Sequence, residues 1–124
     1  MTPLEPNAVA FSMPGGEGSG STPARPVDLV HLGRQTMGDR ALEQEVLDMF
    51  MHHAVQVRDQ IAGATVNERL SLAHGLKGSA RGIGAFAIAD WASAIETQPQ
   101  DQHLLQRLAD LIDEVRDFIA TINR

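Results

Sequence analysis

Apolar residues recur every three or four positions along most of the chain beyond residue 27, and this spacing is typical of amphipathic helices. Four long segments carry such a stripe, with short polar connections between them. The positions expected to be buried are Leu42, Val46, Met49, Phe50, Ala54, Val57 and Ile61 in the first segment; Leu72, Leu76 and Ile83 in the second; Ala85, Ile88, Ala89, Ala92 and Ile95 in the third; and Leu104, Leu108, Leu111, Ile112, Val115, Phe118, Ile119 and Ile122 in the fourth.

Residues that favour helix ends mark the boundaries in the first half of this region. A short leading helix is expected over residues 28–36, and Asp39 is a candidate N-cap for the first long helix, which Gly63 ends. Thr65 and Glu68 have the spacing of a capping box, in which each side chain binds the other residue's backbone N–H. A second long helix is therefore predicted to begin there.

In the second half, Gly82 and Gly84 predict a break, residues 85–97 form the next helix, and Pro99 separates it from the last. No pair of strands is indicated. Short connections favour antiparallel neighbours. The fold class expected is therefore all-α: an antiparallel four-helix bundle over residues 27–124, with a short additional N-terminal helix.

The first 26 residues have a different composition. They contain all but one of the six prolines, and residues 15–21 offer no apolar side chain to bury. Such a segment cannot offset the entropy lost on ordering. Residues 1–26 are therefore predicted to be a disordered tail or linker.

Charge and cysteine content narrow the function classes. The formal net charge of −6 argues against a protein whose whole surface binds nucleic acid. The chain has no cysteine, which excludes disulfides and thiolate chemistry. No apolar run is long enough to span a membrane, and the N-terminus does not look like a signal peptide. We expect a cytoplasmic protein.

Candidate chemistry concentrates in the second long helix. At about 100° per residue, Lys77, Gly78 and Arg81 fall within about 60° of His74, and the apolar positions fall on the opposite side. Neutral imidazole is a nucleophile near neutral pH. A lysine one turn away could offset the charge of a phosphoryl group on that ring, and a glycine would leave space for a partner's active site.

Two glycines, Gly75 and Gly78, flank this histidine inside the helix. Each costs about 1 kcal/mol relative to alanine. A purely structural helix has no reason to accept that cost, so the glycines favour a functional surface around His74.

The run from His74 to Ala80, His-Gly-Leu-Lys-Gly-Ser-Ala, followed by Gly84-Ala85, resembles the signature of histidine-phosphotransfer domains. Residues 38–39, 50–51 and 95–96 also match that family's usual pattern, and the resemblance covers nearly all of residues 27–124. It implies that His74 is the phosphoacceptor, Lys77 its charge partner and Gly78 the clearance residue.

The same resemblance implies a phosphocarrier without a kinase activity or ATP site of its own, and the sequence shows no glycine-rich nucleotide motif. The partners implied are response-regulator receiver domains and a sensor histidine kinase, with Mg²⁺ on the receiver rather than on this chain. Leu70 and Arg81, beside His74, would help to dock the receiver. A monomer suits a diffusing carrier.

Other residues have plainer interpretations. Neighbouring His52 and His53 point about 100° apart on a helix, so a metal site is not expected. Trp91 is expected to pack against the core, and Glu96 to make a structural hydrogen bond. Arg69 falls on the buried side of its helix, where an apolar residue is expected, and is predicted to extend to solvent.

Two alternatives to a phosphorelay carrier remain at this point. One is a non-catalytic helical bundle that binds receivers or kinases, with His74 incidental. The other is the phosphoacceptor segment of a larger kinase. Phosphate on His74 distinguishes the carrier from the binding bundle.

Overall fold

The computed structural model describes residues 25–123, and all the regular structure in this range is helical. The five helices are α1 (Leu29–Gln35), α2 (Arg40–Ile61), α3 (Val66–Ile83), α4 (Phe86–Thr97) and α5 (Gln102–Ile122). Residues 1–24 of the predicted tail lie outside the described residues, so its disorder stays a prediction.

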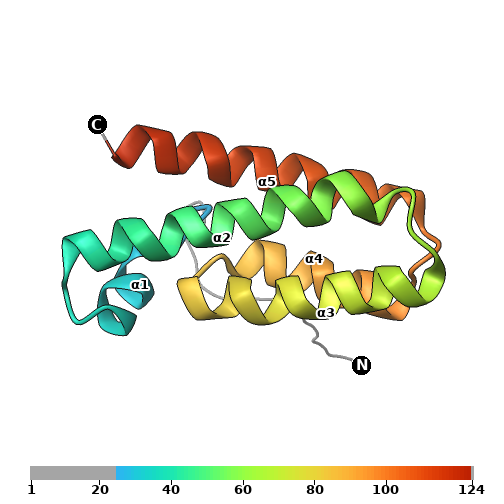
Figure 1. Ribbon diagram of the computed structural model, residues 1–124, viewed down its shortest axis with the longest axis horizontal. Coiled ribbons are helices and arrows are strands. Elements are labelled where there is room, and N and C mark those ends of the chain that lie inside the picture. Colours follow the sequence, from blue (N-terminus) through green and yellow to red (C-terminus); the bar gives the residue numbers. More distant parts are fainter. Residues whose placement is uncertain (1–24, 124) are drawn as a thin grey trace, which may run out of the picture.

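The four long helices close into an antiparallel bundle. Helix α3 packs on α2 and α4, and α5 packs on the same two helices from the other side (Figure 1). The short α1 packs against the end of α3. This architecture confirms the predicted fold class. None of the described helices is long and apolar enough to cross a membrane.

Side-chain caps set the starts of the helices where the sequence predicts them. Oδ1 of Asp39 accepts a hydrogen bond from the backbone N–H of Leu42 at 3.1 Å. Oγ1 of Thr65 accepts from the N–H of Glu68 at 3.2 Å, and Oε1 of Glu68 accepts from the N–H of Thr65 at 2.9 Å. The capping box is therefore confirmed. Each such cap stabilises a helix by about 1 kcal/mol.

The core confirms most of the predicted positions and corrects two stripes, those of α2 and α5. The positions predicted to be buried that are only partly buried are Val46, Leu72, Leu104, Phe118 and Ile122. All five apolar positions predicted in α4 and at its N-cap are buried. In α2, however, Met49 and Leu42 are exposed, whereas Leu47, which the stripe omitted, is buried. Met49 and Leu42 lie roughly 80–100° around the helix from buried Phe50, and Leu47 lies only about 60° from it. In α5 the buried position that the stripe omitted is Leu105.

Gly84 ends α3 and contacts Asp28, which lies near the beginning of the described residues. It ends α3 with φ = 90°, a conformation that favours glycine. Its carbonyl accepts a hydrogen bond from the N–H of Asp28 at 2.9 Å, and a Cβ at this position would lie 2.8 Å from the Asp28 carbonyl oxygen. Gly82, the other predicted break, lies within α3. Only Gly84 is needed for the turn.

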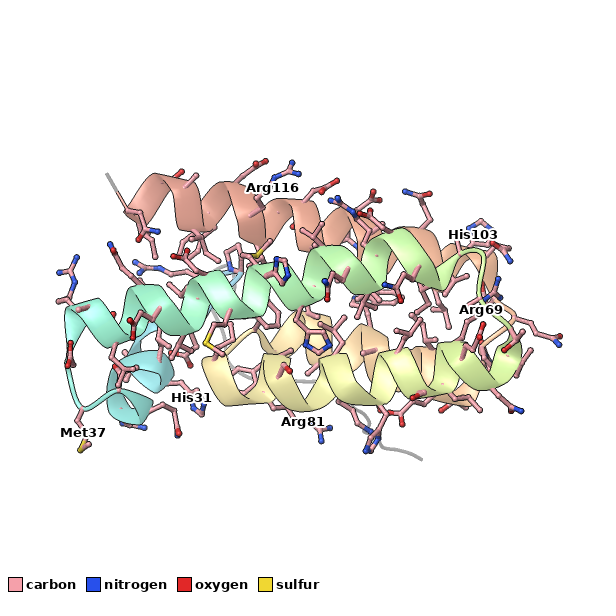
Figure 2. All side chains as sticks on the ribbon, in the orientation of Figure 1. His31, Met37, Arg69, Arg81, His103 and Arg116 are labelled. Carbon is pink, nitrogen blue, oxygen red and sulfur yellow. The ribbon has the colours of Figure 1, made fainter. Side chains whose placement is uncertain are left out.

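Arg69 is buried, and the prediction that it extends to solvent is wrong. Its side chain lies where α2 turns into α3 (Figure 2). Nε donates to the carbonyl of Ile61 at 3.0 Å, Nη2 to that of Ala62 at 2.7 Å and Nη1 to that of Pro99 at 2.9 Å. The carbonyls at the end of α2 have no partner within the helix. Arg69 therefore caps α2 and ties it to the α4–α5 connection.

Candidate functional site

His74 lies in the middle of α3, on the side that the sequence predicts. Its side chain is 74% exposed, while the neighbouring Ala73 and Leu76 are completely buried. The helix thus turns one face into the core and presents the imidazole to solvent. An exposed ring is what a reaction with another protein requires.

A carboxylate from the next helix binds the exposed imidazole. Oε2 of Glu96, near the end of α4, lies 3.0 Å from Nδ1 of His74. The other carboxylate oxygen pairs with Nζ of Lys77, one turn further along α3. The side chains of Lys77 and Glu96 are only 18% and 24% exposed. His74, Lys77 and Glu96 form a cluster that joins α3 to α4, which we call the imidazole–carboxylate cluster.

The charge of Glu96 follows from its neighbours. The hydrogen bond from Lys77 lowers the pKa of Glu96, partial burial raises it, and the hydrogen bond with His74 lowers it further, so that the net shift is downward. Glu96 is therefore ionised at neutral pH. An ionised carboxylate can only accept hydrogen bonds. Nδ1 of His74 must then carry the proton, which leaves the lone pair of the neutral ring on Nε2.

The position of Lys77 modifies the expectation drawn from the sequence. Lys77 was expected to be a positive charge next to His74, ready to offset a phosphoryl group. It does lie next to His74, but its charge is already matched by Glu96. Without phosphate, the cluster has no net charge when the imidazole is neutral.

Glu96 is the site residue that sequence reasoning missed. The prediction that it makes a hydrogen bond is confirmed, but its partner is His74 rather than the scaffold. The one signal for it was its place in the Ile95–Glu96 pair that closes α4. Helical spacing within α3 could not reveal it, because it lies on a different helix.

The glycines beside His74 are not required by packing within the bundle. Gly78 is exposed, and a Cβ built there meets no atom within 4 Å. At Gly75 the nearest atoms would be Cε1 and Nε2 of His53, both 3.9 Å away, which is ordinary contact. The absence of side chains on this face therefore leaves room outside the bundle rather than inside it.

The other predicted docking residues lie on the same helix. Leu70 is half-buried rather than fully exposed, and Arg81 is exposed near the C-terminal end of α3 (Figure 2). Arg81 also acts on Asp90 of α4. Burial raises the pKa of Asp90, and the positive charge of Arg81 partly counteracts that rise. Their roles in docking stay predictions.

The adjacent histidines of α2 have different surroundings. His52 is exposed, and its Nε2 lies 3.3 Å from Nε2 of Gln56. Nδ1 of His53 is 3.1 Å from Oγ of Ser79, whose hydroxyl donates to the carbonyl of Gly75 at 3.2 Å. In the part of the chain that the structure describes, no three His, Cys, Asp or Glu side chains are grouped to hold a metal ion.

Packing around α4 agrees with the sequence at one more position. Trp91 is half-buried and packs against the core, as predicted. It therefore helps to hold α4, the helix that carries Glu96, against the core.

Comparison with known protein families gives one match. The sequence profile described as the Hpt domain matches residues 42–118, which include most of α2, all of α3 and α4 and most of α5. Comparisons with curated proteins and with solved structures give no significant match. The matched region contains the entire imidazole–carboxylate cluster and more than half of the chain. The chain therefore belongs to the Hpt domain family, whose members carry out histidine phosphotransfer in phosphorelays.

Proposed function

We propose that His74 is the phosphoacceptor, taking a phosphoryl group from a receiver aspartate or a kinase and passing it to another receiver. The observation that carries this proposal is the exposed imidazole whose Nδ1 is engaged by Glu96. Because the lone pair is then on Nε2, Nε2 is the nucleophile.

The transfer itself needs only alignment and charge balance. Nε2 attacks the phosphorus of an aspartyl phosphate in line; the P–Nε2 bond forms and the P–O bond breaks. The aspartate carboxylate leaves with the electron pair of that bond. Phosphoryl transfer depends mainly on positioning and electrostatic stabilisation. This chain would supply the nucleophile and Lys77, whereas the receiver would supply Mg²⁺.

The docking surface proposed for the receiver is the outer face of α3 with the adjoining part of α2. Gly78 leaves this surface open next to His74. Half-buried Leu70 offers apolar contact and Arg81 offers a positive charge. An aspartyl phosphate set in a receiver's active site must come within bonding distance of Nε2, so a surface without side chains at this point favours the approach.

The direct test is phosphate transfer from a phosphorylated receiver to the wild-type chain and to His74→Gln. We expect label on the wild type only, lost in acid and retained in base, as for phosphohistidine. His103→Gln, which replaces another exposed histidine, serves as the matched control and should accept label normally. Normal uptake by His74→Gln would refute the assignment of the site, and no uptake by the wild type from a panel of cognate receivers would favour a binding bundle.

A further inference from the structure

The hydrogen bond between His74 and Glu96 bears on the state of the ring after phosphorylation as well as before it. The ring reacts through Nε2 while Nδ1 holds a proton. Its immediate product is therefore an imidazolium with a phosphoryl group on Nε2 and the original proton on Nδ1. The ring gains one positive charge, and the departing carboxylate carries away one negative charge, so the step is balanced.

This product has two possible fates that differ in reactivity. If the Nδ1 proton is lost to water, the phosphoryl group is bonded to a neutral ring, and imidazolate would be a poor leaving group. If the proton stays, the next transfer releases neutral imidazole, which is a good leaving group. The acid lability of phosphohistidine has the same cause. The partner of Nδ1 therefore decides whether the phosphoryl group is stored or passed on.

We propose that Glu96 keeps the proton on Nδ1 throughout the transfer, so that phosphorylated His74 stays an imidazolium and donates its phosphoryl group readily. This inference rests on the proposed function of His74. Glu96 is a positioning residue, since it acts on the reacting atom through the far side of the ring.

The charges around the ring support this role. Glu96 comes from α4, lies 3.0 Å from Nδ1 and is only 24% exposed, so the attraction between the carboxylate and the imidazolium is weakly screened. Lys77, the charged neighbour on α3 itself, holds the other carboxylate oxygen and so fixes the carboxylate in place. Arg81 of α3 and Asp90, which precedes Glu96 in α4, influence each other. His53 of α2 lies next to this face of α3, with its Nδ1 3.1 Å from Oγ of Ser79. Glu96 is the carboxylate that contacts the ring.

The test follows the ring proton directly. The chain is phosphorylated with phosphoramidate, which requires no receiver, and the ³¹P chemical shift of phosphorylated His74 is followed against pH, with the signal assigned by its absence in His74→Gln. In Glu96→Gln the side chain can still accept the hydrogen bond but has no charge. We expect the titration midpoint to fall by about one pH unit, because a nearby opposite charge stabilises the protonated ring by that order. The half-life of the phosphorylated form near pH 7 should lengthen several-fold.

A control variant with the same change in net charge keeps the test decisive. Glu114→Gln on α5 makes the same change in net charge away from the site, at an exposed residue, and should leave the midpoint unchanged. Equal midpoints for wild type and Glu96→Gln, or an equal fall in Glu114→Gln, would overturn the inference. Failure of transfer from receivers, with these midpoints as expected, would instead refute the proposed function alone.

Discussion

Nδ1 of His74 and Oε2 of Glu96 lie 3.0 Å apart, although 22 positions separate the two residues in the chain. This contact determines which nitrogen of the exposed ring is free to react. It also places the ionised carboxylate of Glu96 next to the ring, and a negative charge there does not suit a residue that binds phosphate directly. Under the role proposed for Glu96, this arrangement favours passing a phosphoryl group on over retaining it.

Stability should depend on pH through Glu96. Because its pKa in the folded chain lies below the ordinary value of 4.5, ionised Glu96 stabilises the fold above that value, and this contribution is lost as pH falls through the lower, folded-state pKa. Glu96→Gln should therefore lose less stability than wild type between about pH 5 and pH 3. Urea unfolding of both proteins across this range measures the difference. Parallel curves for the two proteins would contradict the prediction.

Substitution at Gly78 should separate stability from transfer. Gly78→Ala should stabilise the bundle by up to about 1 kcal/mol, because alanine favours the helix and its Cβ meets nothing. Gly78→Gln should slow phosphate transfer from a receiver at least tenfold while leaving the bundle folded. Thermal unfolding and single-turnover transfer measure the two effects. Gly33→Ala in α1, where a Cβ also meets nothing, is the control that should leave transfer unchanged. Unaltered transfer in Gly78→Gln would show that Gly78 is not needed to leave space for the receiver.

Gly84 should respond in the opposite way. Gly84→Ala forces a side chain into a left-handed conformation and sets its Cβ 2.8 Å from the Asp28 carbonyl oxygen. We expect a loss of about 2–3 kcal/mol in the free energy of unfolding, the sum expected for strain and displaced packing. Denaturant unfolding compared with Gly78→Ala provides the measurement. A loss below about 0.5 kcal/mol would show that the Asp28 segment does not constrain this turn.

Loss of the Arg69 side chain should weaken the end of the bundle that it ties together. Arg69→Met keeps much of the apolar stem but leaves the carbonyls of Ile61, Ala62 and Pro99 without their donor. Hydrogen bonds from charged groups contribute about 1.5–3 kcal/mol each and do not add fully, so we expect a loss of about 3 kcal/mol. Arg69→Lys should recover only part of it, since one ammonium group cannot reach three carbonyls in this fork geometry. Equal stability of Arg69→Met and wild type would contradict this role.

Features that depend on local spacing were predicted well from the sequence. The helix starts at Asp39 and Thr65, the buried face of α4 and the outward direction of His74 are all set by neighbours within a few residues, and the structure confirms each. The N-terminal half of α2 was predicted less well, because Leu42 and Met49 have the right spacing for a stripe that tertiary packing places elsewhere.

Contacts between helices could not be predicted in the same way. Arg69 is a charged residue on a buried face, and its position is explained by the carbonyls at the end of α2 and in the α4–α5 connection. Glu96 contacts His74 from α4, and the spacing of residues within α3 gives no indication of that contact. Both depend on how α2, α3 and α4 are placed relative to one another, which periodicity alone does not define.

The division of the imidazole–carboxylate cluster between two helices has a consequence for fidelity. A short peptide copied from α3 would contain every residue from His74 to Gly78, yet it would lack the carboxylate that selects the reactive nitrogen. The same is true of an unfolded or newly made chain, in which α4 has not yet docked. Under the proposed function, the reactivity of His74 through Nε2 therefore depends on completion of the tertiary structure.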